Sequence, residues 1–443
     1  MPQALDGSTI CAISTAPGAG GIAVVRVSGP DALTVSSSIF SKKLGKKHDR
    51  GVVFGRIIDG ESIIDEGLAL VLCGPGSYTG EDTVEFNIHG SAFIQGEVIR
   101  LLILAGCRLA GPGEFTQRAF LNGKLDLTQA EAVADLIAAE HSGAHRLAVE
   151  QLRGNFSREI GKLRASLIEF AGLLELELDF SEEDVEFADR TRFLELIEKL
   201  LGRVTSLADS FRAGNAIKSG VPIAILGAPN AGKSTLLNAL VGDDRAIVSD
   251  IAGTTRDVIE DTCVIDGVLF RFIDTAGIRE TSDVIETEGI KRAFEKASSA
   301  HTVLYMLDSS QDDLNSAYTK ISSLDISEEI NLIVVWNKCD VKAAPLGKIE
   351  GCSNSISISA SSGDGIDTIK KLLVESHGIH ESASSLVVTN ARHFEALVNA
   401  KESLESVKLG LNVDTPSDLV AIDVRQTLHH LGSITGAVHA DDI

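Results

Sequence analysis

Hydrophobic and polar positions follow different patterns in successive parts of the 443-residue chain. In residues 1–120, short β-branched runs such as 22–27 and 67–72 alternate with glycine-rich turns. Residues 84–89 alternate apolar and polar side chains, which predicts a strand with one face in water, and residues 93–104 have the spacing of an amphipathic helix. We therefore predict a compact α+β domain over residues 1–120.

A helical pattern follows, and it continues from Gly113 to Val221 without a proline, although the chain has nine. Apolar residues recur in it at spacings of three and four, as at Leu163, Leu167, Phe170, Leu174 and Leu178. Residues 386–443 return to this pattern but are too few to form a stable core alone, so we expect them to pack against helices of 125–215. The predicted domains are residues 1–120, a helical domain of 121–216 and 381–443, and an inserted domain of 217–380.

The inserted segment opens with an apolar run, 221–226, followed by Gly227-Ala228-Pro229-Asn230-Ala231-Gly232-Lys233-Ser234 and then a helical pattern. Strand, glycine-bounded loop and helix form the context of a phosphate-binding P-loop. The glycines let backbone N–H groups wrap around a phosphate chain. Lys233 can then reach the β- and γ-phosphates, and the Ser234 hydroxyl can ligate Mg²⁺.

Four further motifs follow the P-loop in order. Gly253-Thr254-Thr255-Arg256-Asp257 occupies the position of a switch loop, and Asp274-Thr275-Ala276-Gly277 comes directly after the strand pattern 268–273. Asn337-Lys338-Cys339-Asp340 offers a carboxylate to the two donors of guanine, which adenine lacks. The fourth motif, Ser359-Ala360, resembles the loop that closes over the guanine. The predicted GTP-binding residues are Asn230, Ala231, Gly232, Lys233, Ser234, Thr235, Gly253, Thr254, Thr255, Asp274, Thr275, Ala276, Gly277, Asn337, Lys338, Asp340, Ser359 and Ala360.

Composition narrows the classes of partner. A net charge of −23 argues against broad, unaided binding to a nucleic acid backbone, and the one basic cluster is residues 42–50. No apolar run approaches the ~20 residues of a membrane span, and no basic-then-apolar leader follows Met1, so we expect a cytoplasmic protein with no membrane partner. The six cysteines are scattered, which indicates reduced thiols rather than a metal site.

These motifs resemble those of one family over the whole chain. Residues 10–23, 78–82, 108–116 and 120–127 are similar to N-terminal motifs of the tRNA-modification GTPase family MnmE, also called TrmE. The centre carries that family's Gly-x-Pro-Asn-Ala-Gly-Lys-Ser, Gly-Thr-Thr-Arg-Asp and Asp-Thr-Ala-Gly-Ile-Arg-Glu. The resemblance implies a multidomain α+β and α/β fold: an N-terminal α+β folate-binding and dimerisation domain, an α-helical bundle, and an inserted Ras-like P-loop GTPase domain.

The resemblance also implies a reaction. A homodimer, with a flavin-dependent partner of the MnmG/GidA type, would add an aminomethyl or carboxymethylaminomethyl group to C5 of the wobble uridine of certain tRNAs, using a tetrahydrofolate derivative. Arg26, Glu85 and Lys124 match the family's folate-contacting positions. A carboxylate can accept hydrogen bonds from a pterin, and cations can bind the folate tail. Without the resemblance, we would interpret Glu85 as a residue on the solvent-facing side of a strand and Arg26 as a surface cation.

Hydrolysis needs a residue that orients water, and the position after Asp-x-x-Gly is Ile278, which cannot do so. Either hydrolysis is very slow, or another residue and another cation take over. The resemblance implies that Glu286 and Arg256 are catalytic, with Glu286 orienting the water; taken alone, Glu286 would be a solvated glutamate. It also implies that Mg²⁺ binds at Ser234 and Thr255. A K⁺ site at Asn230, Gly253 and Thr254 would form when two GTPase domains meet.

The alternative class is a regulatory GTP switch in ribosome assembly or at a membrane. Such proteins share Gly-Thr-Thr-Arg-Asp, but a ribosome-assembly switch usually carries a basic RNA-binding appendage and has no need of the 1–120 domain. Family members end in Cys-x-Gly-Lys, whereas this sequence stops at Asp441-Asp442-Ile443, so the redox-active cysteine has no assignment. We expect the 443-residue form to hydrolyse GTP and bind folate but to leave tRNA unmodified.

Overall fold

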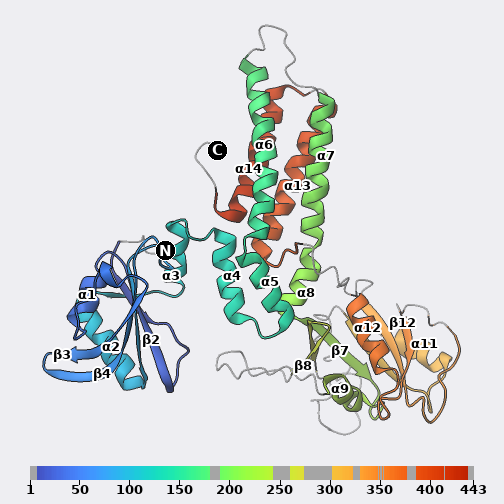
Figure 1. Ribbon diagram of the computed structural model, residues 1–443. Helices are drawn as coiled ribbons and strands as arrows, with labels where there is room; N and C mark the ends of the chain where they lie inside the picture. Colours follow the sequence, from blue (N-terminus) through green and yellow to red (C-terminus); the bar gives the residue numbers. More distant parts are fainter. Residues whose placement is uncertain are drawn as a thin grey trace, which may run out of the picture. The chain divides into compact units, whose positions relative to one another are not determined.

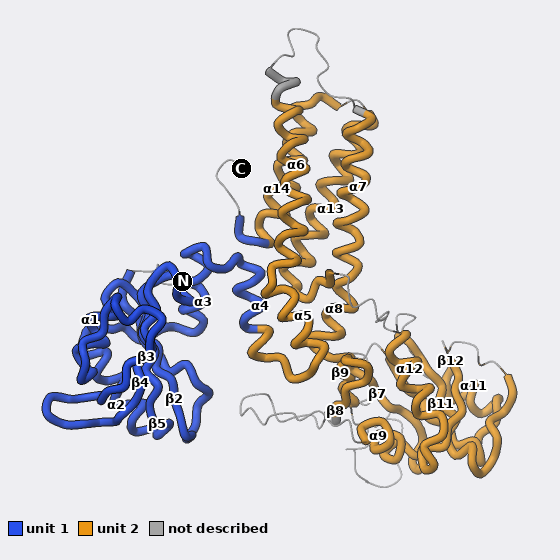
Figure 2. Tube along the Cα trace, viewed as in Figure 1, with its two compact units in different colours: residues 1–134, 435–437 blue, residues 135–434, 438–443 orange. Residues whose placement is uncertain are grey.

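The fold is taken from a computed structural model. It describes residues 7–179, 190–242, 260–273, 302–322, 330–347, 349, 352, 354–376, 386–413 and 415–437. The chain divides into two compact units: unit 1 comprises residues 1–134 and 435–437, and unit 2 comprises residues 135–434 and 438–443 (Figure 2). Each unit contains its own hydrophobic core.

Unit 1 is built on a mixed sheet with the strand order β3-β4-β5-β2-β1-β6, in which only the β1–β6 pair is parallel. Its core alternates along the strands as a one-sided sheet requires: Val25, Val27, Val84 and Phe86 are fully buried. Its elements are β1 (Ile10–Ile13), β2 (Gly20–Ser28), α1 (Ala32–Ser38), the 3₁₀ turn η1 (Lys46–His48), β3 (Gly51–Asp59), β4 (Ser62–Leu72), β5 (Thr83–Gly90), α2 (Ala92–Leu104), β6 (Arg108–Leu109) and α3 (Glu114–Leu121).

The strands and helix predicted in residues 1–120 are present as β2, β4, β5 and α2. Strand β3 was not predicted, and its burial explains why. Val52 and Phe54 are more than half exposed, so apolar residues occupy both faces and the alternation that marks a strand is missing. Helix α4 (Leu127–Ala138) runs from unit 1 into unit 2.

Long helices form the first core of unit 2. Figure 1 shows α6, α7, α13 and α14 running side by side, and one cluster of buried apolar residues joins them. Its members come from two stretches far apart in sequence, 156–208 and 388–434, so the chain after 386 packs against the helices before 221. The helices are α5 (Ser142–Leu152), α6 (Asn155–Asp179), α7 (Arg190–Asp209), α8 (Phe211–Ser219), α13 (Ala391–Asn412) and α14 (Ser417–Thr435).

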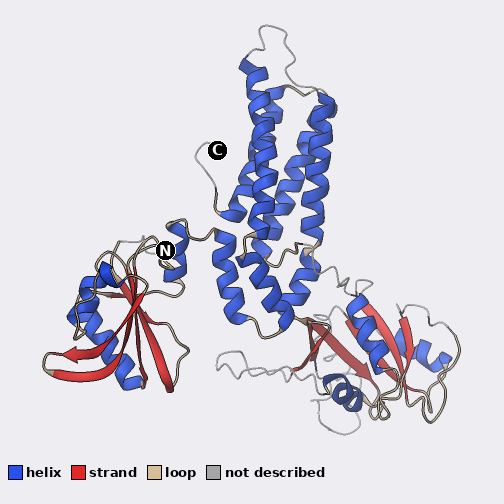
Figure 3. Ribbon diagram, in the orientation of Figure 1, coloured by secondary structure: helices blue, strands red, loops and turns tan. Residues whose placement is uncertain are grey.

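A second sheet completes unit 2, with the order β12-β11-β10-β7-β9-β8 and only β8 antiparallel to its neighbour. One buried cluster joins the sheet to α9 and α12, and another joins its opposite face to α11, as in a doubly wound α/β fold (Figure 3). The elements are β7 (Val221–Gly227), α9 (Lys233–Val241), β8 (Glu260–Ile265), β9 (Val268–Ile273), β10 (Thr302–Asp308), α11 (Leu314–Ser322), β11 (Asn331–Asn337), β12 (Asn354–Ser357) and α12 (Ile366–Ser376).

Burial on both faces explains why these strands are continuous apolar runs in the sequence. All seven residues of β10 are buried, and so are six of the seven in β11. The predicted fold class, multidomain α+β and α/β, is confirmed, whereas the domain boundaries at 120, 216 and 380 stay predictions. Within the described ranges, no helix combines the length and the apolar character needed to cross a bilayer.

Candidate functional site

The predicted P-loop connects β7 to α9, and two of its positions accept only glycine. A Cβ added to Gly227 would lie 2.5 Å from the carbonyl oxygen of Met306, and one added to Gly232 would lie 2.2 Å from Nδ2 of Asn337. Both residues also have positive φ, 147° and 99°. The loop is therefore pressed closely against β10 and the end of β11, and it leads into the N-terminus of α9, where free N–H groups attract anions.

Polar side chains of this loop face solvent. Asn230, Ser234 and Thr235 are exposed, and Asn230 has a left-handed φ of 63°. Lys233 folds back over its own loop, and its Nζ donates hydrogen bonds to the carbonyl oxygens of Gly227 at 2.7 Å and Ala228 at 2.9 Å. The ammonium group thus lies beside the loop whose N–H groups are predicted to hold phosphate.

Asn337, at the end of β11, joins three of the predicted motifs. Its side chain is buried; its Nδ2 donates to the carbonyl oxygen of Ala231 at 2.8 Å, and its Oδ1 accepts from the backbone N–H of Ala360 at 2.9 Å. Asp340, three residues later, is exposed. The structure therefore brings the P-loop, the 337–340 motif and the 359–360 loop to one place, at the carboxyl ends of parallel strands.

Lys338 has a partner that the sequence analysis missed. Its Nζ lies 2.6 Å from Oδ2 of Asp308, the last residue of β10. Burial opposes the charge of Asp308, but hydrogen bonds from Lys338 and Ser310 outweigh it and lower the pKa of the carboxyl group. A signal was present, because Asp308 directly follows the apolar run 302–307, just as Asp274 follows 268–273.

Several predicted residues lie outside the described residues, and their roles stay predictions. They belong to the segment before β8 and to the segment after β9. They are Gly253, Thr254, Thr255, Arg256, Asp274, Thr275, Ala276, Gly277, Ile278 and Glu286.

The predicted folate-contacting residues lie in unit 1, and two of them meet. Arg26 on β2 stands opposite Glu85 on β5, and Nε of Arg26 lies 2.8 Å from Oε1 of Glu85. The Arg26 guanidinium also lies 5.3 Å from the ring centres of both Tyr78 and Phe115, two aromatic residues that the sequence analysis did not select. Lys124 makes a different contact: its Nζ donates to the carbonyl oxygen of Pro75 at 2.9 Å.

A buried ionic network lies in the same unit. Arg118, only 2% exposed, contacts Glu114 at 3.0 Å and Glu81 at 3.1 Å, and Arg108 contacts Glu114 at 2.6 Å. The hydrogen bond from Arg108, helped by others from the Gly111 backbone and Arg118, lowers the pKa of Glu114 to about 2. The carboxylate of Glu114 is therefore charged at every pH near neutrality.

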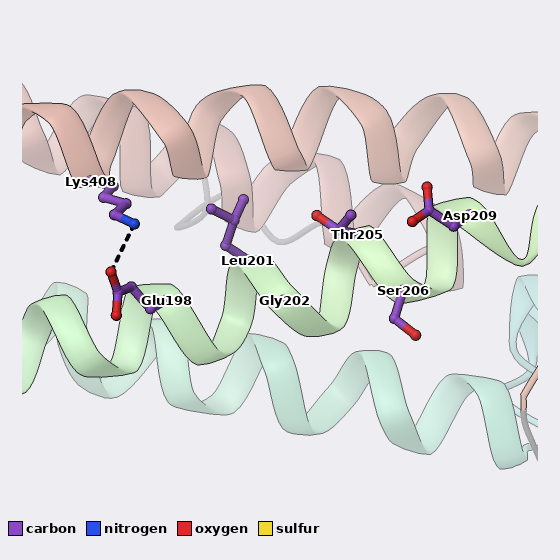
Figure 4. Close-up of a pocket in the computed structure, with 7 residues that line it drawn as sticks. All are labelled: Glu198, Leu201, Gly202, Thr205, Ser206, Asp209 and Lys408. Atoms are coloured by element: carbon purple, nitrogen blue, oxygen red, sulfur yellow. Dashed lines mark ion pairs between the residues drawn. The ribbon is translucent and has the colours of Figure 1, made fainter.

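A depression of about 560 Å³ lies between α7 and α13, but none of the predicted site residues lines it (Figure 4). Lys408 and Glu198 point toward one another across it and form an ion pair at 2.8 Å. The remaining lining residues are Leu201, Gly202, Thr205, Ser206 and Asp209. In the part of the chain that the structure describes, no group of three or more His, Cys, Asp or Glu residues could hold a metal ion.

A doubly wound sheet with a glycine-bounded loop and an asparagine that ties this loop to the 359–360 loop defines a P-loop nucleotide-binding protein. The family model "GTP-binding protein TrmE N-terminus" matches residues 9–124, and "MnmE helical domain" matches residues 127–443. The chain belongs to the MnmE family of tRNA modification GTPases. It is a GTP hydrolase that acts in tRNA modification, with GTP and tRNA as substrates.

Curated relatives match nearly the whole chain. The tRNA modification GTPase MnmE of Christiangramia forsetii is 50% identical over an alignment 459 positions long. The alignment covers 98% of this chain and 96% of the relative. The protein of the same name from Parabacteroides distasonis is 50% identical over 454 residues, covering 98% and 97%. That from Flavobacterium psychrophilum is 46% identical over 449 residues, covering 98% and 96%.

Proposed function

We propose that the protein is a K⁺-dependent GTP hydrolase that adds an aminomethyl or carboxymethylaminomethyl group to C5 of the wobble uridine of certain tRNAs. It would work as a homodimer with a flavin-dependent partner of the MnmG/GidA type and take a one-carbon unit from a tetrahydrofolate derivative. This reaction would take place in the cytoplasm. The observation that carries the nucleotide part is the pair of hydrogen bonds by which Asn337 joins Ala231 to Ala360.

The nucleotide would lie at the carboxyl ends of β7 and β11. Lys233 would leave the carbonyl oxygens of its own loop and bind the β- and γ-phosphates, because phosphate oxygens offer it a stronger, charged acceptor. The exposed carboxylate of Asp340 would accept two hydrogen bonds from guanine. Ser234, exposed in the first turn of α9, fits Mg²⁺ as a hydroxyl ligand, and Thr255 would be the second protein ligand.

A potassium ion fits the oxygen ligands offered by Asn230 and its predicted neighbours. This side chain is exposed on the P-loop and offers a neutral amide oxygen, and the backbone carbonyls of Gly253 and Thr254 would complete a set suited to a large, weakly hydrated ion. When bound, the ion supplies positive charge against the negative charge that develops on the transferred phosphate. We assign the orientation of the attacking water to Glu286, with Arg256 as the second catalytic residue.

The folate derivative would bind at Arg26, Glu85 and Lys124. The ion pair of Arg26 with Glu85 supports this assignment, because it presents one acceptor and one cation side by side, each about four-fifths buried. Lys124 is exposed beside Pro75 and can release that carbonyl for a carboxylate of the folate tail.

Two experiments test the proposal. The chain is incubated with its flavin-dependent partner, GTP, K⁺, a one-carbon folate, ammonium or glycine, and unmodified tRNA, and each component is left out in turn. Modified wobble uridine, detected by mass spectrometry of nucleosides, should be absent from every mixture that lacks folate or the partner. If it forms without folate or without the partner, that part of the proposal is wrong.

The second experiment measures folate binding by calorimetry. Arg26→Ala should weaken the binding of 5-formyltetrahydrofolate about tenfold or more, the loss expected for one charged hydrogen-bonding group. Arg56→Ala is the matched control, since Arg56 lies on β3 of the same sheet and also pairs with a glutamate, Glu66, at 2.7 Å. Equal loss in both variants would mean that Arg26 has no special role.

A further inference from the structure

The end of strand β10 is tied to the turn that carries Asp340. Asp308 stands opposite Asn337 in the parallel pair of β10 and β11. The next residue, Ser309, donates its backbone N–H to the carbonyl oxygen of Asn337 at 3.0 Å and its Oγ to that of Lys342 at 2.7 Å. Both ends of the 337–342 turn are therefore held by Ser309, the residue that follows β10.

Asp308 adds a charged contact in the middle of this attachment. Its side chain is 9% exposed, and one carboxylate oxygen lies 2.6 Å from Nζ of Lys338. The other oxygen accepts hydrogen bonds from Ser310, from the backbone N–H at 3.0 Å and from Oγ at 2.6 Å. Because both oxygens are engaged, the carboxylate has one orientation, and it sets the direction of the Lys338 side chain.

Lys338 needs such support. Its backbone lies in the left-handed region, with a φ of 63°, which an L-residue adopts only when its surroundings hold it there. Its side chain is long and 35% exposed, so it would otherwise sample several rotamers. Lys338 lies in the turn between Asn337, which is hydrogen-bonded to the P-loop, and Asp340, which is exposed. A contact that holds Lys338 in place therefore also holds the conformation of this turn.

We propose that Asp308 is a positioning residue of the nucleotide site: it acts through Lys338, holds the 337–340 turn in the form that binds guanine, and takes no part in hydrolysis. The proposal rests on the assignment of Asn337–Asp340 to guanine recognition. It predicts that Asp308 raises affinity for every guanine nucleotide, GDP and GTP alike, while kcat at saturating GTP stays the same.

The test uses Asp308→Asn, Lys338→Met, the double variant and a control in the full chain. Displacement of a fluorescent GDP analogue gives the affinity for GDP. Asp308→Asn should weaken GDP binding about tenfold, the size expected for one coupled charged pair. Lys218→Met is the control: Lys218 forms a similar ion pair, with Asp135 at 2.7 Å, and among the described hydrogen bonds and ion pairs it contacts neither Asp308 nor the 337–342 turn, so GDP binding should not change.

The double variant decides whether Asp308 acts through Lys338. Once Lys338 is methionine, Asp308→Asn should cost no further affinity. If the two losses multiply instead, or if Asp308→Asn alone lowers kcat and leaves affinity unchanged, the proposal is wrong. If Asp308→Asn does not fold, Ser310→Ala loosens the same carboxylate more gently and should weaken GDP binding a few-fold; unchanged binding then overturns the proposal. A wild-type chain that binds no guanine nucleotide would instead refute the assigned site itself.

Discussion

Replacing Gly143 with alanine should weaken the contact between α5 and the hairpin of β8 and β9. Gly143 is buried in the first turn of α5, and a Cβ added there would lie 2.0 Å from the carbonyl oxygen of Gly267 and 3.0 Å from Cγ2 of Ile217. Gly267 follows Asp266 in the turn between the strands, and both have positive φ, as a tight Asp-Gly hairpin turn requires. Because the oxygen belongs to this turn, it cannot move aside as a flexible side chain would.

Two opposing effects set the size of the change. Forcing an extra methyl group into a packed site costs about 1–3 kcal/mol. Alanine in place of glycine stabilises a helix by at most about 1 kcal/mol. We therefore expect Gly143→Ala to lower the free energy of unfolding by about 1–2 kcal/mol. The matched control is Gly202→Ala, because Gly202 is exposed within α7 and an added Cβ meets no atom within 4 Å, so stability should rise by about 0.5–1 kcal/mol.

The assay is urea unfolding followed by two signals. The single tryptophan, Trp336, is buried in β11 and its fluorescence reports on the second sheet, while far-UV circular dichroism follows the helices. A chain with several cores need not unfold in one step, so midpoints are compared signal by signal. Gly143→Ala should lower the fluorescence midpoint, and Gly202→Ala should raise the dichroism midpoint. A Gly143→Ala protein as stable as the wild type by both signals would refute the close packing of α5 on the hairpin.

Four further outcomes are expected. Replacing K⁺ with Na⁺ at equal ionic strength should slow GTP turnover greatly; equal rates would remove the cation from the mechanism. Glu286→Ala should keep GTP binding and lower kcat ~10²-fold or more; lost affinity with normal kcat would make Glu286 structural. Asp340→Asn should trade guanine for xanthine nucleotides, and an unchanged GTP preference would contradict the assignment. Glu114 has a pKa of about 2, below its ordinary 4.5, so the stability it contributes is present above pH 4.5 and is lost as pH falls toward 2. The difference in urea midpoint between wild type and Glu114→Gln should shrink over that range, and a constant difference would contradict the charged network.

Local pattern was enough to predict much of the fold. The strands around the P-loop are buried on both faces, and the apolar runs they require, such as 221–226 and 268–273, are visible in the sequence. The helices that share the first core of unit 2 show apolar spacings of three and four for the same reason, since each buries one stripe. The pattern failed at β3, where Val52 and Phe54 are exposed and the sequence no longer records which face is inside.

The sequence by itself therefore determined the class of protein, the order of its motifs and the residue types at the candidate nucleotide site. Only the tertiary structure decided which residues meet. Asn337 contacts Ala231 across 106 positions of the chain, Lys338 pairs with Asp308, and Arg26 lies close to the rings of both Tyr78 and Phe115. Hydrophobic periodicity records which side of an element is buried, but a hydrogen bond near 3 Å depends on the register, the twist and the packing of every element between its partners. Those quantities are set by the whole fold, and no local stretch of sequence contains them.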